Sequence, residues 1–281
     1  MKLLHHSIVL FRPGLKFFRR KDIVKSMTRT GRNNTVLMMA VSVFLAALVT
    51  IVLFTFNLGE IDPQPGQWRA IAGALATTVI AFTVAVVYMR LFHRSPSVPV
   101  FFMVLFFIFS ALDISKLGQV MVSATAWRHF SPLLARVSIF GHVTGALALF
   151  AAGLYASVAR MQRHGTAMTM GLVIALGLSW AVPIDTFRIR ENLVYSAGFH
   201  PSLDAMILVV LVLAVLNFIH AALVVRERRQ LMSAGAVALI VLGRETLFYR
   251  TEPLLIALGA ALLVTGAAVF AVENYRDYLV G

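Results

Sequence analysis

Six ionisable side chains stand inside long apolar runs of this chain or close to their ends. They are Asp113, Lys116, Arg136, His142, Arg244 and Glu245. A charged side chain within a membrane is costly, so each is a candidate functional residue. At about 1.5 Å of rise per helical residue, all six fall near the middle or in the outer half of their runs. The sequence therefore predicts an outward-facing polar cluster, and one interpretation is a pocket that binds a small polar or anionic ligand. Interhelical polar contacts and snorkelling to water are the open alternative.

The spacing of these residues also predicts how they pair. Asp113 and Lys116 are three residues apart and share one helical face. Arg244 and Glu245 are adjacent, so their side chains leave a helix about 100° apart. We therefore expect each to pair with another helix, Arg244 with Asp113 and Glu245 with Lys116 or Arg136.

His142 lies in the segment Gly141-His142-Val143-Thr144-Gly145. Two glycines four residues apart allow another helix to approach closely. The imidazole could act as a proton-linked switch, since histidine titrates near neutral pH in water. It could equally be a core histidine that bonds a neighbouring carbonyl group.

The histidines do not form the pattern of a cofactor or metal site. His142 lies about 11 Å out of level with His220, whereas a membrane haem needs two facing ligands at matching depth. His93 and His220 match better in depth, but both lie at the inner rim. The chain has no cysteine, no H-E-x-x-H motif and no G-x-S-x-G motif. We expect no metal, no cofactor and no catalytic residue.

The composition excludes a soluble protein. Of the 281 residues, 59% are hydrophobic and 13% are charged, and the mean hydropathy is +0.85. Soluble domains carry about 45–50% apolar and about 25% charged residues. The predicted fold is an all-α, polytopic membrane helix bundle.

The apolar runs predict about eight transmembrane helices, since a helix needs about 20 residues to cross the hydrocarbon core. The runs are Val36–Phe56, Ala70–Leu91, Val98–Val120, Leu133–Ser157, Met168–Val182, Leu203–Val225, Met232–Tyr249 and Leu254–Val272. The seventh run is interrupted by Gly243, Arg244 and Glu245, so seven spans remain an alternative. We divide the chain into a basic amphipathic segment (1–35), the bundle (36–272) and a short tail (273–281).

The net charge of +13 comes from basic residues that lie mostly in short connectors. This placement follows the positive-inside rule, and it favours anionic lipid over nucleic acid as the partner. It predicts that both termini are cytoplasmic, which requires an even number of spans. We expect a multi-pass protein of a bacterial inner membrane.

The longest outer connector runs from Pro183 to Ser202. We expect a short interfacial helix, a lid over the bundle or a plain loop. Asp185 in this connector is a candidate residue at the rim of the pocket.

These features favour a non-enzymatic sensory, receptor-like or accessory membrane module that acts through a membrane or cytoplasmic protein partner. The support is an outward polar cluster combined with short loops. A small secondary transporter of a polar or anionic solute is the alternative, since a short fifth run and a broken seventh run are typical of discontinuous helices.

Overall fold

The computed structural model describes residues 17–57, 59, 65–91, 97–124, 128–157, 164–189, 193, 195–197, 200–225 and 228–280. The chain divides into two units, residues 1–39 and residues 40–281. The described part of the first unit is helical backbone from residue 17 onward. The predicted boundary of the amphipathic segment at residue 35 lies within this helix, and residues 1–16 lie outside the described residues.

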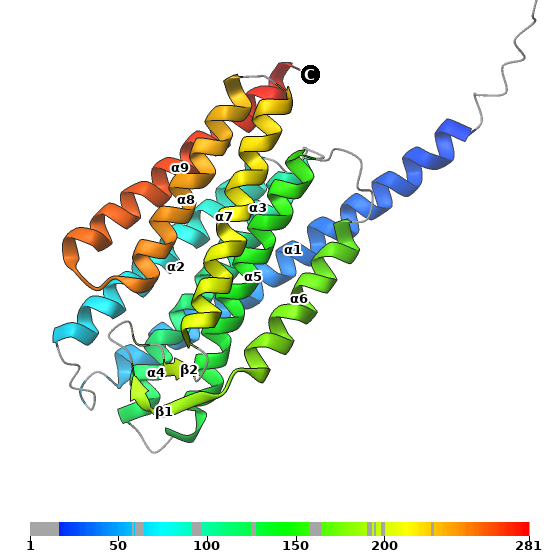
Figure 1. Cartoon of the computed structure of the whole chain (residues 1–281). Coiled ribbons are helices and arrows are strands. Elements are labelled where there is room, and N and C mark those ends of the chain that lie inside the picture. The colour runs from blue at the N-terminus through cyan, green and yellow to red at the C-terminus, as the bar shows by residue number, and fades with distance from the viewer. Residues whose placement is uncertain are drawn as a thin grey trace, which may run out of the picture. The chain divides into compact units, whose positions relative to one another are not determined.

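The second unit is a helix bundle with one small hairpin (Figure 1). The elements of the chain are α1 (Phe17–Phe56), α2 (Pro65–Leu91), α3 (Val98–Ser110), the 3₁₀ helix η1 (Ala111–Ile114), α4 (Ser115–Ala124), the 3₁₀ helix η2 (Arg128–Phe130), α5 (Ser131–Ser157), α6 (His164–Ala181), β1 (Ile184–Ile189), β2 (Tyr195–Ala197), α7 (His200–Val225), α8 (Arg228–Tyr249) and α9 (Pro253–Val280). The prediction of a polytopic membrane helix bundle is confirmed.

Seven helical segments of the described chain are long and apolar enough to cross a membrane. Helix α6 is the exception, because its apolar stretch, Gly165–Ala181, is shorter. Figure 1 shows α6 running beside α5, back toward the end of the bundle that carries β1. Its 18 residues measure about 27 Å, close to the thickness of the hydrocarbon core. The count of seven or eight therefore depends on α6. Our expectation that it depends on the seventh run was wrong, since α8 is continuous.

The third span is divided in the middle. This span, Val98–Val122, is the most buried of the spans. It consists of α3, the 3₁₀ helix η1 and α4 in direct succession. A 3₁₀ segment inside a helix tightens the turn and often marks a functional hinge. Asp113 lies within this segment, so the break brings a carboxylate to the centre of the bundle.

The connector after α6 forms an antiparallel β-hairpin of β1 and β2, in which Ile184 pairs with Ala197. The expectations of an interfacial helix, a lid or a plain loop did not include this structure. Alternating Ile184, Thr186 and aromatic or β-branched neighbours favour an extended strand. Asp185 lies on β1, but its side chain lies outside the described residues.

Glycines allow two pairs of elements to approach closely. A Cβ atom on Gly141 of α5 would lie 2.8 Å from the Cβ atom of Leu112 in η1. On α8, a Cβ atom on Gly243 would lie 2.7 Å from the carbonyl oxygen of Gly259 in α9. A Cβ atom on Gly266 of α9 would lie 2.7 Å from the carbonyl oxygen of Ala236. Helices α8 and α9 therefore meet backbone to backbone over several turns.

Candidate functional site

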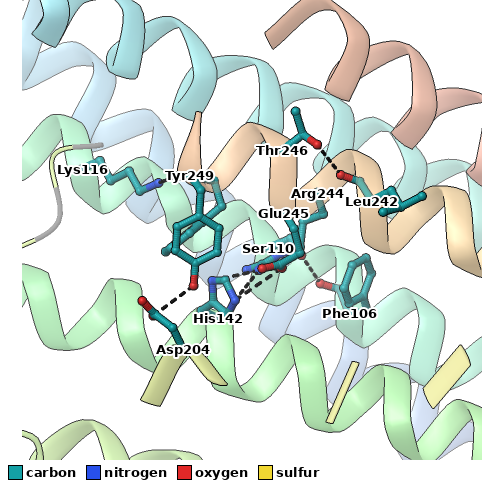
Figure 2. Close-up of polar contacts among 11 residues, drawn as sticks. Phe106, Ser110, Lys116, His142, Asp204, Leu242, Arg244, Glu245, Thr246 and Tyr249 are labelled. Carbon is teal, nitrogen blue, oxygen red and sulfur yellow. Dashed lines mark hydrogen bonds and ion pairs between the residues drawn. The ribbon is translucent and has the colours of Figure 1, made fainter. Parts of the chain in front are cut away.

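Arg244 is the centre of the buried polar cluster (Figure 2). Its side chain is 1% exposed, on α8. Its Nη1 atom lies 2.9 Å from Nδ1 and 3.0 Å from Nε2 of His142 on α5, and its Nε atom donates to Oγ of Ser110 on α3 at 3.3 Å. One guanidinium group thus connects three helices.

Glu245 completes the cluster. Its Oε1 atom accepts a hydrogen bond from Nη1 of Arg244 at 2.9 Å and lies 3.4 Å from Nε2 of His142. The prediction that adjacent Arg244 and Glu245 would not pair was therefore wrong. The long guanidinium arm bends back toward its neighbour, because both side chains converge on the same imidazole ring.

The hydrogen-bond chemistry of His142 follows from its two charged neighbours. A carboxylate only accepts hydrogen bonds and a guanidinium group only donates them. When Nε2 carries the hydrogen and faces Glu245, the bare Nδ1 atom accepts from Nη1 of Arg244, and the 3.0 Å approach of Nη1 to Nε2 is then a close contact without a hydrogen bond. This is an assignment from the hydrogen-bond network. Ser110 fits the same logic, because its hydroxyl donates to the carbonyl of Phe106 at 2.8 Å and accepts from Arg244.

Phe248 lies between the cluster and Lys116. The Nζ atom of Lys116 lies 3.7 Å from the centroid of this ring and donates to the Phe248 carbonyl oxygen at 3.2 Å. The guanidinium carbon of Arg244 lies 5.4 Å from the same centroid, and the His142 ring meets it edge to face at 4.1 Å. The electron-rich ring face attracts both cations.

Asp113 is buried and makes no hydrogen bond to the described part of the chain. It is 1% exposed, and neither carboxylate oxygen has a hydrogen-bond partner among the described residues. The predicted pair of Asp113 with Arg244 is therefore not formed, because Arg244 is directed to Glu245 and His142. Burying a carboxylate without hydrogen bonds is expensive, so Asp113 is a costly group to keep at this position.

Arg136 does not join the cluster. Its guanidinium carbon lies 4.5 Å from the ring centroid of Trp180, which is 64% exposed on α6. The expected contact between Arg136 and Glu245 is absent, since Glu245 bonds Arg244. The position beside an exposed tryptophan agrees with the alternative that Arg136 extends toward the membrane interface.

The sequence interpretation missed Ser110, Asp204 and Tyr249. The hydroxyl of Tyr249 at the end of α8 donates to Oδ1 of Asp204 near the start of α7 at 3.0 Å, and its ring lies 6.1 Å from that of His142. The useful signal would have been that an acidic residue begins the sixth apolar run while a tyrosine ends the seventh, so that antiparallel neighbours place both at one level.

Among the described residues, no three histidine, aspartate or glutamate side chains gather as a metal site. His220 is exposed on α7, away from the cluster. Comparison of the sequence with protein-family models and with curated proteins found no match.

Proposed function

We propose that this multi-pass membrane protein is a sensory or receptor-like module whose helix packing depends on the Arg244 network. The single observation that carries the proposal is that Arg244 binds groups on α3, α5 and α8 at once. A stimulus that changes the hydrogen-bond partners of Arg244 therefore changes the contacts of three helices together.

The network extends toward the end of the bundle that carries the hairpin. Tyr249 links α8 to α7 through Asp204, and Glu245 is the only member of the Arg244, His142 and Glu245 trio with appreciable exposure, at 17%. A small polar or anionic molecule that competes for Arg244 would approach from this side. The resulting change in packing would be passed to a protein partner.

The experiment measures helix positions in the membrane. The chain contains no cysteine, so spin labels can be attached at Leu133→Cys on α5 and Leu242→Cys on α8, both of which are exposed. We expect Arg244→Gln to shift the distance distribution between the labels, whereas Arg250→Gln, at an exposed position, leaves it unchanged. An unchanged distribution in a folded Arg244→Gln protein would overturn the proposal.

Partner association is tested by native mass spectrometry of protein gently extracted from its own membrane. A co-purifying protein at fixed stoichiometry supports a sensory or accessory module. A chain that is always alone contradicts action through a partner.

A second candidate function, a small secondary transporter, is favoured by the break in the third span at Asp113. Transporter sites near the middle of the membrane are typically formed by discontinuous helices. Reconstituted vesicles would show uptake of a small carboxylate or amino acid, and Asp113→Asn would abolish uptake while the protein stays folded.

We further propose that both termini face the cytoplasm of a bacterial inner membrane, with anionic lipid against the basic connectors. Arg90 ends α2, and Arg228 and Arg229 begin α8. The positive-inside rule places such connectors in the cytoplasm. Labelling of single cysteines introduced at Gly59 and Gln230 with an impermeant reagent tests this, since we expect them on opposite sides.

A further inference from the structure

The buried polar atoms without partners are concentrated on a few elements. Nine side-chain atoms in seven described residues are buried and lack a hydrogen-bond partner. All of them lie on η1, α4, α5 or α8, in Asp113, Ser115, Gln119, Arg136, Ser138, Thr144 and Arg244. Such a concentration is unusual, because buried polar groups are normally satisfied by protein or by ordered water.

The glycine contacts fix how α4 and η1 lie against α5. Gly141 approaches Leu112, and Gly118 approaches Leu134. The two segments are therefore antiparallel, and residues whose numbers sum to about 252 or 253 face each other at one level. This register places Ser115 opposite Ser138.

Both serines also lie on the contact faces. Ser138 is four residues from Leu134 and three from Gly141, and Ser115 is three residues from both Leu112 and Gly118, so they share the helical stripes that meet. Ser138 is 0% exposed and Ser115 is 4% exposed.

These two hydroxyls behave differently from other hydroxyls in the bundle. Thr50, Thr77 and Ser110 each bond the carbonyl oxygen one turn earlier in their own helix. Ser115 and Ser138 make no such bond.

The unpartnered groups continue along the interface in both directions. Gln119 shares the helical face of Ser115 and lies nearer to the end of α4, which Figure 1 shows beside β1 and β2. Asp113 lies on the other side, nearer to the cluster, and it interacts electrostatically with His142. The polar groups thus form a row from the hairpin end of the bundle to the Arg244 cluster.

We propose that ordered water molecules occupy the interface between α4 and α5 and form a hydrated path from the hairpin end to Arg244. The row contains a group that only accepts, Asp113, a group that only donates, the Nη2 atom of Arg244, and hydroxyl and amide groups that do both. Water is the ligand that meets all of them, since a buried water makes two to four hydrogen bonds to polar groups. The path does not depend on the proposed function, since it would supply water to the cluster in a receptor and in a transporter alike.

The test is the reactivity of thiols introduced along the row. Ser115→Cys and Ser138→Cys replace a hydroxyl by a thiol of similar size in a cysteine-free chain. A small, charged, membrane-impermeant methanethiosulfonate reagent reacts with the thiolate, which needs water around it. Ala152→Cys is the control, because Ala152 is 0% exposed on the same helix but lies beyond the cluster.

We expect both serine variants, in intact membranes, to react at least tenfold faster than Ala152→Cys. Adding Gln119→Leu should slow the reaction of Ser115→Cys about tenfold, because an apolar side chain then interrupts the row. Reaction of all thiols after denaturation verifies that each is present. If Ser115→Cys and Ser138→Cys in monodisperse protein react no faster than Ala152→Cys, the interface is dry and the proposal is wrong. The helix-distance measurement on Arg244→Gln is unaffected by that outcome.

Discussion

The Nζ atom of Lys116 binds Phe248 twice, through the ring face at 3.7 Å and through the carbonyl oxygen at 3.2 Å. These contacts hold a buried ammonium group by an aromatic side chain and a backbone group. They also attach α4 to the end of α8, where the Arg244 cluster lies.

Replacing Phe248 by leucine should destabilise the protein by about 2 kcal/mol, since it removes a desolvated cation–π contact and part of a buried ring. Thermal unfolding in detergent measures this effect. Phe56→Leu is the matched control, because Phe56 is 84% exposed, and its Tm should hardly change. Equal effects of the two substitutions would contradict the role of the ring.

Arg244→Gln should destabilise the protein by about 3–5 kcal/mol, because it leaves the partly buried carboxylate of Glu245 without its cation. The double variant Arg244→Gln/Glu245→Gln should be less destabilised than the sum of the single variants. A double-mutant cycle of unfolding free energies measures this coupling. Additive effects would show that the two side chains act independently.

Gly141→Ala should destabilise the protein by about 1–3 kcal/mol, as overpacking does. The new methyl group would lie 2.8 Å from both the Leu112 Cβ atom and the Phe109 carbonyl oxygen. Gly177→Ala in α6 is the control, since nothing lies within 4 Å of its added Cβ atom, and alanine favours a helix over glycine. Opposite signs in Tm are expected; a harmless Gly141→Ala would argue against the close contact of α5 and η1.

Asp113→Asn should raise the stability by about 1–2 kcal/mol, because a neutral amide replaces a buried carboxylate that receives no hydrogen bond from any described residue. Functional sites commonly keep such groups at a cost in stability. Unfolding temperatures in the same detergent measure the change, with Asp204→Asn as the comparison. The Asp204 substitution weakens a hydrogen bond from Tyr249 and should lower the Tm. A lower Tm for Asp113→Asn would instead reveal a stabilising partner for Asp113.

The sequence predicts the fold well because a membrane imposes strong rules. Runs of about 20 apolar residues are necessary for crossing, and seven of the eight predicted spans are confirmed as helices long and apolar enough to cross, α6 being shorter. The break at Asp113 was not predicted, because Ala111, Leu112 and Ile114 are ordinary residues in an α-helix. The hairpin was missed because the sequence between its two strands, residues 190–194, contains no strong turn motif.

The sequence predicted several residues of the candidate site but not the contacts between them. The cost of charge in hydrocarbon pointed to Arg244, Glu245 and His142, which the structure brings together. Their pairing was wrong, because the reach and bending of an arginine side chain cannot be read from helical angles. By residue type, Arg136 could not be distinguished from the arginine that joins the cluster. Only its contact with Trp180 shows that Arg136 lies elsewhere.

The backbone contact between α8 and α9 couples the helix that carries Arg244 to its neighbour. Gly243 stands directly before Arg244 and lies against Gly259, so no side chain at that point absorbs a displacement of α8. A rotation of α8 would therefore also rotate α9. The last turns of α9, which end at Val280, would move with α8, and under the proposed function they are the place where a partner would detect a change at the Arg244 cluster.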